Sequence, residues 1–262
     1  MRRFYSSLAW LFSLACLGAD PLWASDDPFC GKWKLNAEKS NFAGERIKIQ
    51  HLRGNEYKWG SGGGSDTITS DGAYQAVRFG RTITMTPEGP NSWRRVIKKD
   101  GMVISSMTHT LSDDGKMQTI KGTETKPDGT TSDFTAVWKK VSGGAGWAGT
   151  WETTDLKFTS PDEYDIEPYE GDGLSFNTPA YREMLSMKFD GKDFEEKGPN
   201  VAPGSRSSGK RVNDHTLEIT NKVKGQVTDH TKYEVSPDGK TLTVTIRETG
   251  QPKAQTIVYD KM

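Results

Sequence analysis

Histidine is the side chain that proteins use most often as a metal ligand or as a general base near neutral pH. The chain has four histidines, at His51, His109, His215 and His230. No two of them stand four residues apart, the spacing that places two imidazoles on one helix face. The chain also lacks the paired cysteines that complete many zinc sites. The sequence therefore predicts no metal site, and it implies no cofactor.

His109 is the histidine best placed to line a pocket. It falls in the segment Met107-Thr-His-Thr-Leu111, where a strand would put it on the same face as Met107 and Leu111. An apolar face of this kind points to a core or to a ligand cavity. We therefore treat His109 as a candidate ligand-binding residue.

The sequence has no pattern typical of a nucleophilic enzyme or a phosphate-binding loop. Segment 60–65 is rich in glycine but lacks the Lys-Ser/Thr pair that completes a phosphate loop. No Gly-x-Ser-x-Gly motif places a serine on a sharp turn, and the serines of segment 204–209 are typical of a loop. We therefore expect no enzymatic activity.

Two charged segments have both a structural and a binding interpretation. Trp93-Arg94-Arg95 would hold an anionic or aromatic ligand through charge and cation–π contacts, but we favour a strand with one exposed face. The acidic segment 162–172 favours a solvated edge strand, blunted by its charges and by Pro168. A weak calcium site or a partner-docking loop is the alternative for this segment.

The first 24 residues have the features of a signal peptide. Arg2 and Arg3 precede the short apolar run 8–17, and Ala24 offers a small residue at a cleavage site. Cys16 would carry a lipid anchor in a lipoprotein, but Ser13 stands three residues before it, where that signal has leucine, so anchoring is disfavoured. We expect export to the periplasm or the extracellular space.

Charge and hydropathy exclude two classes of partner. The chain has 35 Lys and Arg against 35 Asp and Glu, which leaves no basic excess for binding nucleic acid. After the signal peptide no apolar stretch approaches the length of about 20 residues that a membrane-spanning helix needs. We expect no transmembrane segment and no nucleic-acid partner.

The rest of the chain is predicted to be all-β. Short runs alternate apolar with polar residues, as in Thr241-Leu-Thr-Val-Thr-Ile246, which places Leu242, Val244 and Ile246 on one face. Asp-Gly pairs separate the runs and supply the positive φ angles of tight hairpin turns. This pattern predicts antiparallel meanders that curl into barrels.

The chain carries an internal repeat. Gly31-Lys32-Trp33 opens a stretch that closes at Val137–Lys140, and Gly149-Thr150-Trp151 opens another that closes at Val258–Lys261. We therefore divide the chain into a signal peptide (1–24), a first β-barrel (29–141), a glycine-rich linker (142–146) and a second β-barrel (147–262). One wide barrel built from both copies is the alternative, but the flexible composition of the linker favours two barrels in tandem.

The opening Gly-x-Trp and the closing Val-Tyr-Asp-Lys resemble those of the calycins, the superfamily of lipocalins and fatty-acid-binding proteins. The start of the first copy, from Gly31 to Phe42, is similar to that of uncharacterised secreted lipocalin-like proteins of bacteria. The resemblance implies two antiparallel barrels that hold small apolar ligands. Fatty-acid-binding proteins place an arginine two residues before the closing tyrosine; here Ala136 and Ile257 stand at that place. A simple fatty-acid anion is therefore not well supported by the closing strands.

Several aromatic and apolar residues become site candidates in such barrels. Trp33 and Trp151 are expected to plug one end of each barrel, which is a structural role. The candidates for ligand contact beside His109 are Trp138, Ile257 and Tyr259 on the closing strands, and Tyr181 in a predicted brief helix over 179–185. Because the two copies differ at these positions, we expect a site first in the second copy.

These observations predict an exported lipocalin-like protein that binds a small, mainly apolar ligand without a covalent bond. The alternative is an envelope or secreted protein-interaction module whose barrels are filled by side chains, with an envelope protein as its partner. The inference from architecture to function is an analogy, since one fold supports many functions.

Overall fold

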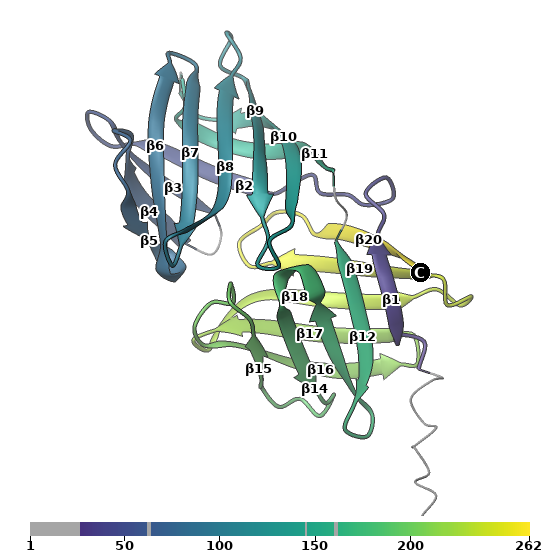
Figure 1. Ribbon diagram of the computed structural model, residues 1–262. Helices are drawn as coiled ribbons and strands as arrows, with labels where there is room; N and C mark the ends of the chain where they lie inside the picture. The colour runs from purple at the N-terminus through teal and green to yellow at the C-terminus, as the bar shows by residue number, and fades with distance from the viewer. Residues whose placement is uncertain (1–26, 62–63, 145, 160–161) are drawn as a thin grey trace, which may run out of the picture.

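The structure is a computed structural model that describes residues 27–61, 64–144, 146–159 and 162–262. Its described residues form antiparallel strands joined by short turns, as the sequence predicts (Figure 1). The predicted signal peptide and Cys16 lie outside the described residues. Among the described residues, no helix has the length and apolar character needed to cross a bilayer.

The first of two ten-stranded sheets occupies the middle of the chain, and we call it the first barrel. Its strands are β2 (Arg46–His51), β3 (Glu56–Ser61), β4 (Gly64–Thr69), β5 (Gln75–Val77), β6 (Arg81–Gly89), β7 (Ser92–Lys99), β8 (Met102–Leu111), β9 (Met117–Thr125), β10 (Thr131–Ser142) and β11 (Gly149–Phe158). They lie in the order β4-β3-β2-β11-β10-β9-β8-β7-β6-β5. A 3-10 turn, η1 (Arg78–Gly80), lies between β5 and β6.

The second sheet is a closed barrel, and we call it the second barrel. Its strands are β1 (Gly31–Leu35), β12 (Glu163–Tyr169), β13 (Gly173–Thr178), β14 (Glu183–Met187), β15 (Phe194–Lys197), β16 (Ser205–Asn213), β17 (Thr216–Val223), β18 (Gln226–Val235), β19 (Thr241–Glu248) and β20 (Gln255–Lys261). In place of the brief helix predicted over 179–185, the 3-10 turn η2 (Pro179–Tyr181) leads directly into β14.

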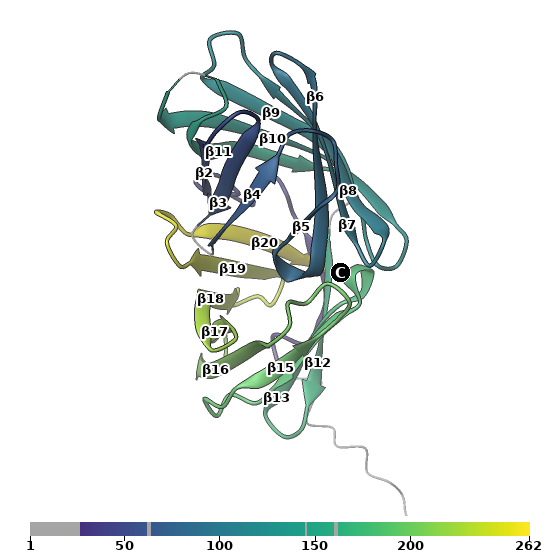
Figure 2. The same ribbon diagram turned by 90° about the vertical axis from the view of Figure 1, so that its left-hand side faces the viewer.

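The two barrels exchange their opening strands. β1 pairs with β12 and with β20 in the second barrel, whereas β11 pairs with β10 and with β2 in the first. Figure 1 shows β1 beside β12 of the second barrel, and Figure 2 shows the two barrels one above the other. The sheets therefore do not follow the contiguous ranges 29–141 and 147–262 that the sequence suggested. Residues 36–45 and the connection from β11 to β12 each run from one barrel to the other.

A short hairpin explains this exchange. The glycine-rich segment 142–146 begins with the last residue of β10, and β11 starts three residues after the segment ends, so the chain turns back onto β10. A Cβ atom on Gly149 would lie 2.6 Å from the Ser142 carbonyl oxygen, an approach that only glycine permits. Closing such a short loop costs little conformational entropy. β11 therefore completes the first barrel, and β1 fills the matching place in the second.

The exchange also corrects the expectation for the acidic segment 162–172. β12 lies between β1 and β13, so it is an interior strand of the barrel and not an edge strand. Its charged residues Glu163 and Glu167 are exposed, while Ile166 points into the core. The alternation of charged and apolar residues in this segment is therefore the ordinary pattern of a strand with one buried face.

The exchanged tryptophans occupy equivalent positions. Trp33 is fully buried in the core of the second barrel and donates its Nε1–H to the Phe29 carbonyl oxygen at 2.8 Å. Trp151 is fully buried in the core of the first barrel and donates to the Trp147 carbonyl oxygen at 3.0 Å. The two tryptophans of the internal repeat therefore have equivalent surroundings, although each one packs in the barrel that is built mainly from the other sequence copy.

Side chains bridge the gap between β4 and β5 in the first barrel. The Gln75 amide accepts from the Thr69 backbone N–H at 2.7 Å and donates to its carbonyl oxygen at 2.6 Å, as a paired strand would. Arg78 Nε donates to Asp66 Oδ2 at 3.1 Å across the same gap. These contacts bring the two end strands of the sheet together and leave an interior enclosed by ten strands.

Candidate functional site

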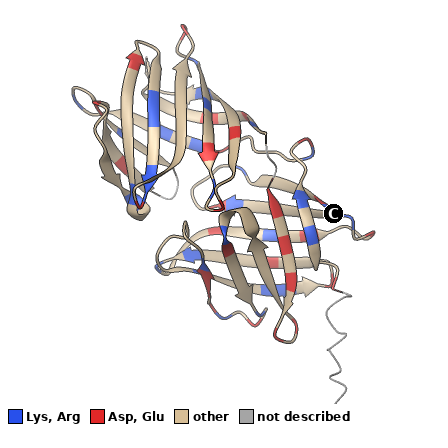
Figure 3. Ribbon diagram, viewed as in Figure 1, with Lys and Arg blue, Asp and Glu red and all other residues tan. Residues whose placement is uncertain are grey.

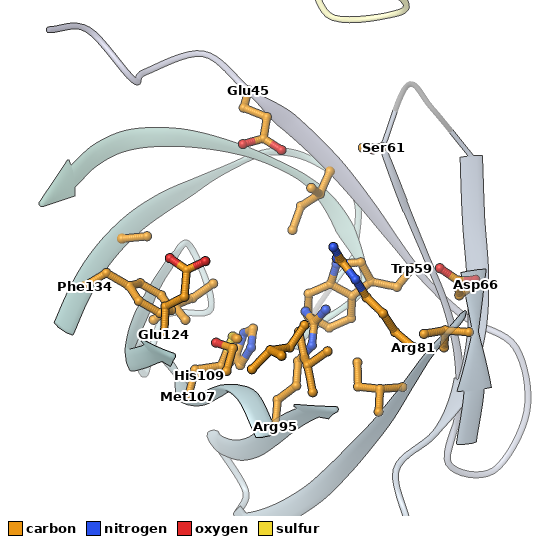
Figure 4. Close-up of a pocket in the computed structure, with 18 of the residues that line it drawn as sticks. Glu45, Trp59, Ser61, Asp66, Arg81, Arg95, Met107, His109, Glu124 and Phe134 are labelled. Carbon is orange, nitrogen blue, oxygen red and sulfur yellow. The ribbon is translucent and has the colours of Figure 1, made fainter. Parts of the chain in front are cut away.

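The interior of the first barrel holds a cavity of about 680 Å³ (Figure 4). Its wall exposes more apolar than polar surface, although about half of the residues that line it carry polar or charged side chains. A mainly apolar wall with convergent polar groups is typical of small-molecule sites. The apolar residues of the wall stand at alternate positions along the strands and face inward. They include Ile47, Ile83, Ile120, Phe134 and Leu156. Alternation along the strands thus puts these side chains inside, as the sequence pattern predicts.

His109 lies in the wall of this cavity and is fully buried. Its Nδ1 lies 2.9 Å from Gln118 Oε1, so in this arrangement Nδ1 carries the proton and Nε2 is an acceptor with no partner among the described residues. Burial, with a further contribution from the nearby Arg95 charge, lowers the pKa of His109 to about 3. The imidazole is therefore neutral across the physiological pH range.

Two arginines also face the cavity. β7 alternates so that Trp93 and Arg95 point inward while Arg94 is exposed, and Arg81 enters from the start of β6. Burial lowers the pKa of Arg95 to about 10, so it stays charged near neutral pH. The Nε atoms of both arginines are buried without a partner in the described structure, as is Trp138 Nε1.

The mouth of the cavity faces the second barrel and is acidic. Glu45 and Glu124 reach it from the first barrel, and Glu183 reaches it from β14. Burial raises the pKa of Glu45 and of Glu183 to about 7 and also raises that of Glu124. Tyr181 in η2 donates its hydroxyl to Glu124 Oε2 at 3.2 Å, so the second barrel contributes part of the rim.

The interior of the second barrel is different. Its cavity is smaller, about 310 Å³, and a group of its polar side chains is paired internally. Asn221 donates to Asp229 at 2.6 Å and accepts from Ser207 at 2.7 Å, while Thr231 donates to Asp229 at 2.8 Å. Buried polar groups that are paired in this way leave little for a ligand to satisfy.

The predicted contact residues divide between these two interiors. His109 and Trp138 lie in the wall of the larger cavity, and Tyr181 lies at its mouth. Ile257 and Tyr259 line the smaller cavity of the second barrel. The sequence directed attention to the second copy, whereas the larger cavity and its unpartnered polar atoms lie in the first barrel.

Sequence reasoning missed the inward arginines. The sequence predicts that Trp93-Arg94-Arg95 is a strand with one exposed face. Arg94 is exposed, as predicted, but the same alternation points Trp93 and Arg95 inward. Trp93 stacks on Trp147 with ring centroids 4.1 Å apart, which fixes the face of the strand. The signal was present in that alternation, since an inward Trp93 requires an inward Arg95. Arg81 had no such signal, because it stands at the start of its strand.

No protein-family model matches this chain, and no curated protein is significantly similar to it in sequence. The all-β architecture with two barrel-like sheets is compatible with a calycin-like fold.

Proposed function

We propose that the first barrel binds a small, mainly apolar molecule reversibly and without a covalent bond, and that the protein acts after export from the cytoplasm. The observation that carries the proposal is the set of unpartnered polar atoms in the cavity wall. Arg81 Nε, Arg95 Nε, His109 Nε2 and Trp138 Nε1 are all buried with no partner in the described structure. A buried polar group without a partner is costly, and a bound molecule would supply the missing contacts.

The alternative, a barrel filled by side chains, fits the second barrel better. Asn221, Asp229 and Thr231 in its interior are paired with one another, and its cavity has less than half the volume of the first. In this proposal the second barrel serves as a rigid support that shapes the mouth of the first, through Tyr181 and Glu183.

Binding of a neutral lipophilic dye, such as 1-aminoanthracene, tests the proposal. Ala136 is buried in the cavity wall, so Ala136→Phe would occupy part of the space. Ala76 is exposed on β5 of the same sheet, and Ala76→Phe is the matched control. We expect dye fluorescence to rise when the wild type or Ala76→Phe is added. Ala136→Phe should bind the dye at least about tenfold more weakly than the wild type does.

Circular dichroism of both variants checks that the fold is retained. Native mass spectrometry of protein purified from its own host gives an independent measurement, in which a co-purifying small molecule supports the proposal. A wild-type protein that binds no dye and carries no small molecule would contradict it.

A further inference from the structure

Arg95 and Arg81 bring positive charge into the apolar cavity of the first barrel. Figure 4 shows both guanidinium groups pointing into the cavity near Trp59. The Arg95 guanidinium carbon lies 5.3 Å from the Trp59 ring centroid, so its flat face is covered by an aromatic ring. In the described parts of the chain, ion pairs are made by other arginines, such as Arg46 and Arg78, and none is made by Arg95 or Arg81.

The acidic groups that face the cavity compensate these charges only in part, although the Asp66 carboxylate favours the charged form of Arg95. Asp66 is bound to Arg78, whose Nε lies 3.1 Å from its Oδ2. Glu45, Glu124 and Glu183 stand at the mouth, where burial raises the pKa of all three. For Glu45 and Glu183 the pKa reaches about 7, so near neutral pH these two carry only part of a negative charge. The Nε–H groups of Arg95 and Arg81 are buried without a partner in the described structure, a costly arrangement that a bound anion would relieve.

The unpartnered donors determine which ligand chemistry fits. Arg95 Nε, Arg81 Nε and Trp138 Nε1 all donate N–H groups and accept nothing. Such donors complement oxygen atoms that carry negative charge, and a guanidinium matches the planar geometry of a carboxylate in particular. His109 adds no charge, since burial keeps it neutral.

We propose that the ligand of the first barrel is an amphiphilic carboxylic acid, whose carboxylate is bound by Arg95 and Arg81 and whose apolar part lies against Ile97, Met107 and Phe134. This inference rests on the proposed function, that the cavity binds a small molecule. It places the anion anchor on β6 and β7, whereas the resemblance to fatty-acid-binding proteins would place it near the closing strand. There, the chain has Ala136 and Ile257.

A matched ligand series separates this inference from the proposed function. Dodecanoate, dodecanol and dodecylamine share one apolar chain and differ in headgroup charge, and each displaces a bound neutral dye if it enters the cavity. The variants are Arg95→Met and, as the control, Arg94→Met. Arg94 is the neighbouring arginine that β7 points into solvent.

For the wild type and Arg94→Met, we expect dodecanoate at pH 8 to bind at least about tenfold more tightly than dodecanol. Arg95→Met is expected to remove that preference while leaving dodecanol binding within about threefold. If dodecanol binds as well as dodecanoate in the wild type, or if dodecylamine binds best, the acid inference is wrong and the proposed function stands. If none of the three displaces the bound dye, the acid inference is wrong and the proposed function stands, whereas a wild type that binds no dye contradicts both.

Thermal unfolding without ligand shows whether Arg95 serves binding or structure. Asp66 compensates the Arg95 charge only in part, so replacing this arginine by an apolar side chain of similar length is expected to be neutral or stabilising. We therefore expect Arg95→Met to raise the melting temperature of the free protein by about 2 to 4 °C, with Arg94→Met unchanged. A fall of more than about 5 °C together with an unchanged dodecanoate preference would overturn the proposal and assign Arg95 a structural role.

Discussion

At the scale of single residues, the first barrel differs from the second in what its buried polar groups contact. In the second barrel Asn221, Asp229 and Thr231 bind one another. In the first, Arg95 and Trp138 each keep a buried nitrogen without a partner in the described structure. An incomplete polar network lowers stability, so its retention points to a role other than holding the fold.

The buried imidazole of His109 gives a pH prediction at this scale. Its pKa is lowered to about 3 in the folded protein, chiefly by burial and next by Arg95. The unfolded chain therefore binds a proton on His109 near pH 6.5, and the folded protein does not. The contribution of the neutral His109 to the unfolding free energy is fully present above about pH 6.5 and is lost as the pH falls towards 3.

We expect His109→Gln to remove this dependence. Between pH 6.5 and 4.5 the wild type should lose about 2 kcal/mol more unfolding free energy than the variant, measured by urea denaturation. Taking the difference between the two proteins cancels the opposite effect of Glu45 and Glu183, whose raised pKa values favour the folded state as the pH falls. Equal pH slopes for the two proteins would contradict a neutral, buried His109.

At the scale of elements, the exchange of β1 and β11 decides which fragment of the chain can form a barrel. Residues 36–159 contain every strand of the first barrel, from β2 to β11. Residues 27–142 contain one full sequence copy, but they lack β11 and with it the fully buried Trp151. A sheet that loses an interior strand leaves two rows of backbone donors and acceptors unpaired.

We expect fragment 36–159 to fold and fragment 27–142 to remain unfolded or to aggregate. The loss of one Trp core side chain alone costs about 3 to 5 kcal/mol, a large part of the stability of a domain. Dispersed amide resonances in a two-dimensional NMR spectrum and a cooperative thermal transition report folding. A folded fragment 27–142 beside an unfolded fragment 36–159 would show that the strands are not exchanged.

At the scale of the whole molecule, the barrels are joined by two crossing segments and by ionic contacts. Lys126, in the turn after β9, has a buried side chain whose Nζ lies 2.6 Å from Asp162 Oδ1, in the segment that leads to β12. The Asp128 backbone N–H donates to the Ala180 carbonyl oxygen at 3.1 Å in the same region. In the view of Figure 3, charges of both signs are interspersed over the described strands of the two barrels.

The Lys126–Asp162 pair gives a prediction at this scale. Asp162→Ala leaves a buried ammonium without its partner, so we expect a loss of about 1 to 3 kcal/mol of unfolding free energy in urea. Lys126→Met removes the charge itself and should cost less. The double variant should resemble Lys126→Met, because the second change then removes only a long hydrogen bond of 3.5 Å from the Tyr181 hydroxyl to Asp162. Additive losses in the double variant would show that the two residues do not interact.

The sequence by itself determined the all-β class, the internal repeat, the alternation of inward and outward residues, and the burial of Trp33 and Trp151. These follow from local pattern, since alternation and turn chemistry fix strands and their faces over a few residues. Part of the candidate site also came from such patterns, because His109 and Trp138 stand on inward faces.

Only the tertiary structure decided which barrel each opening strand joins, and which barrel keeps an open cavity. Strand exchange depends on contacts between segments far apart in the chain, such as Trp33 with Lys261, and no local pattern encodes them. Whether a cavity remains depends on how the inward side chains of ten strands fill the interior of the barrel. Arg95 and Tyr181 come from different barrels and line the same cavity. Packing in three dimensions, and not residue type alone, turned an exposed-looking Arg95 into the proposed anchor of a ligand.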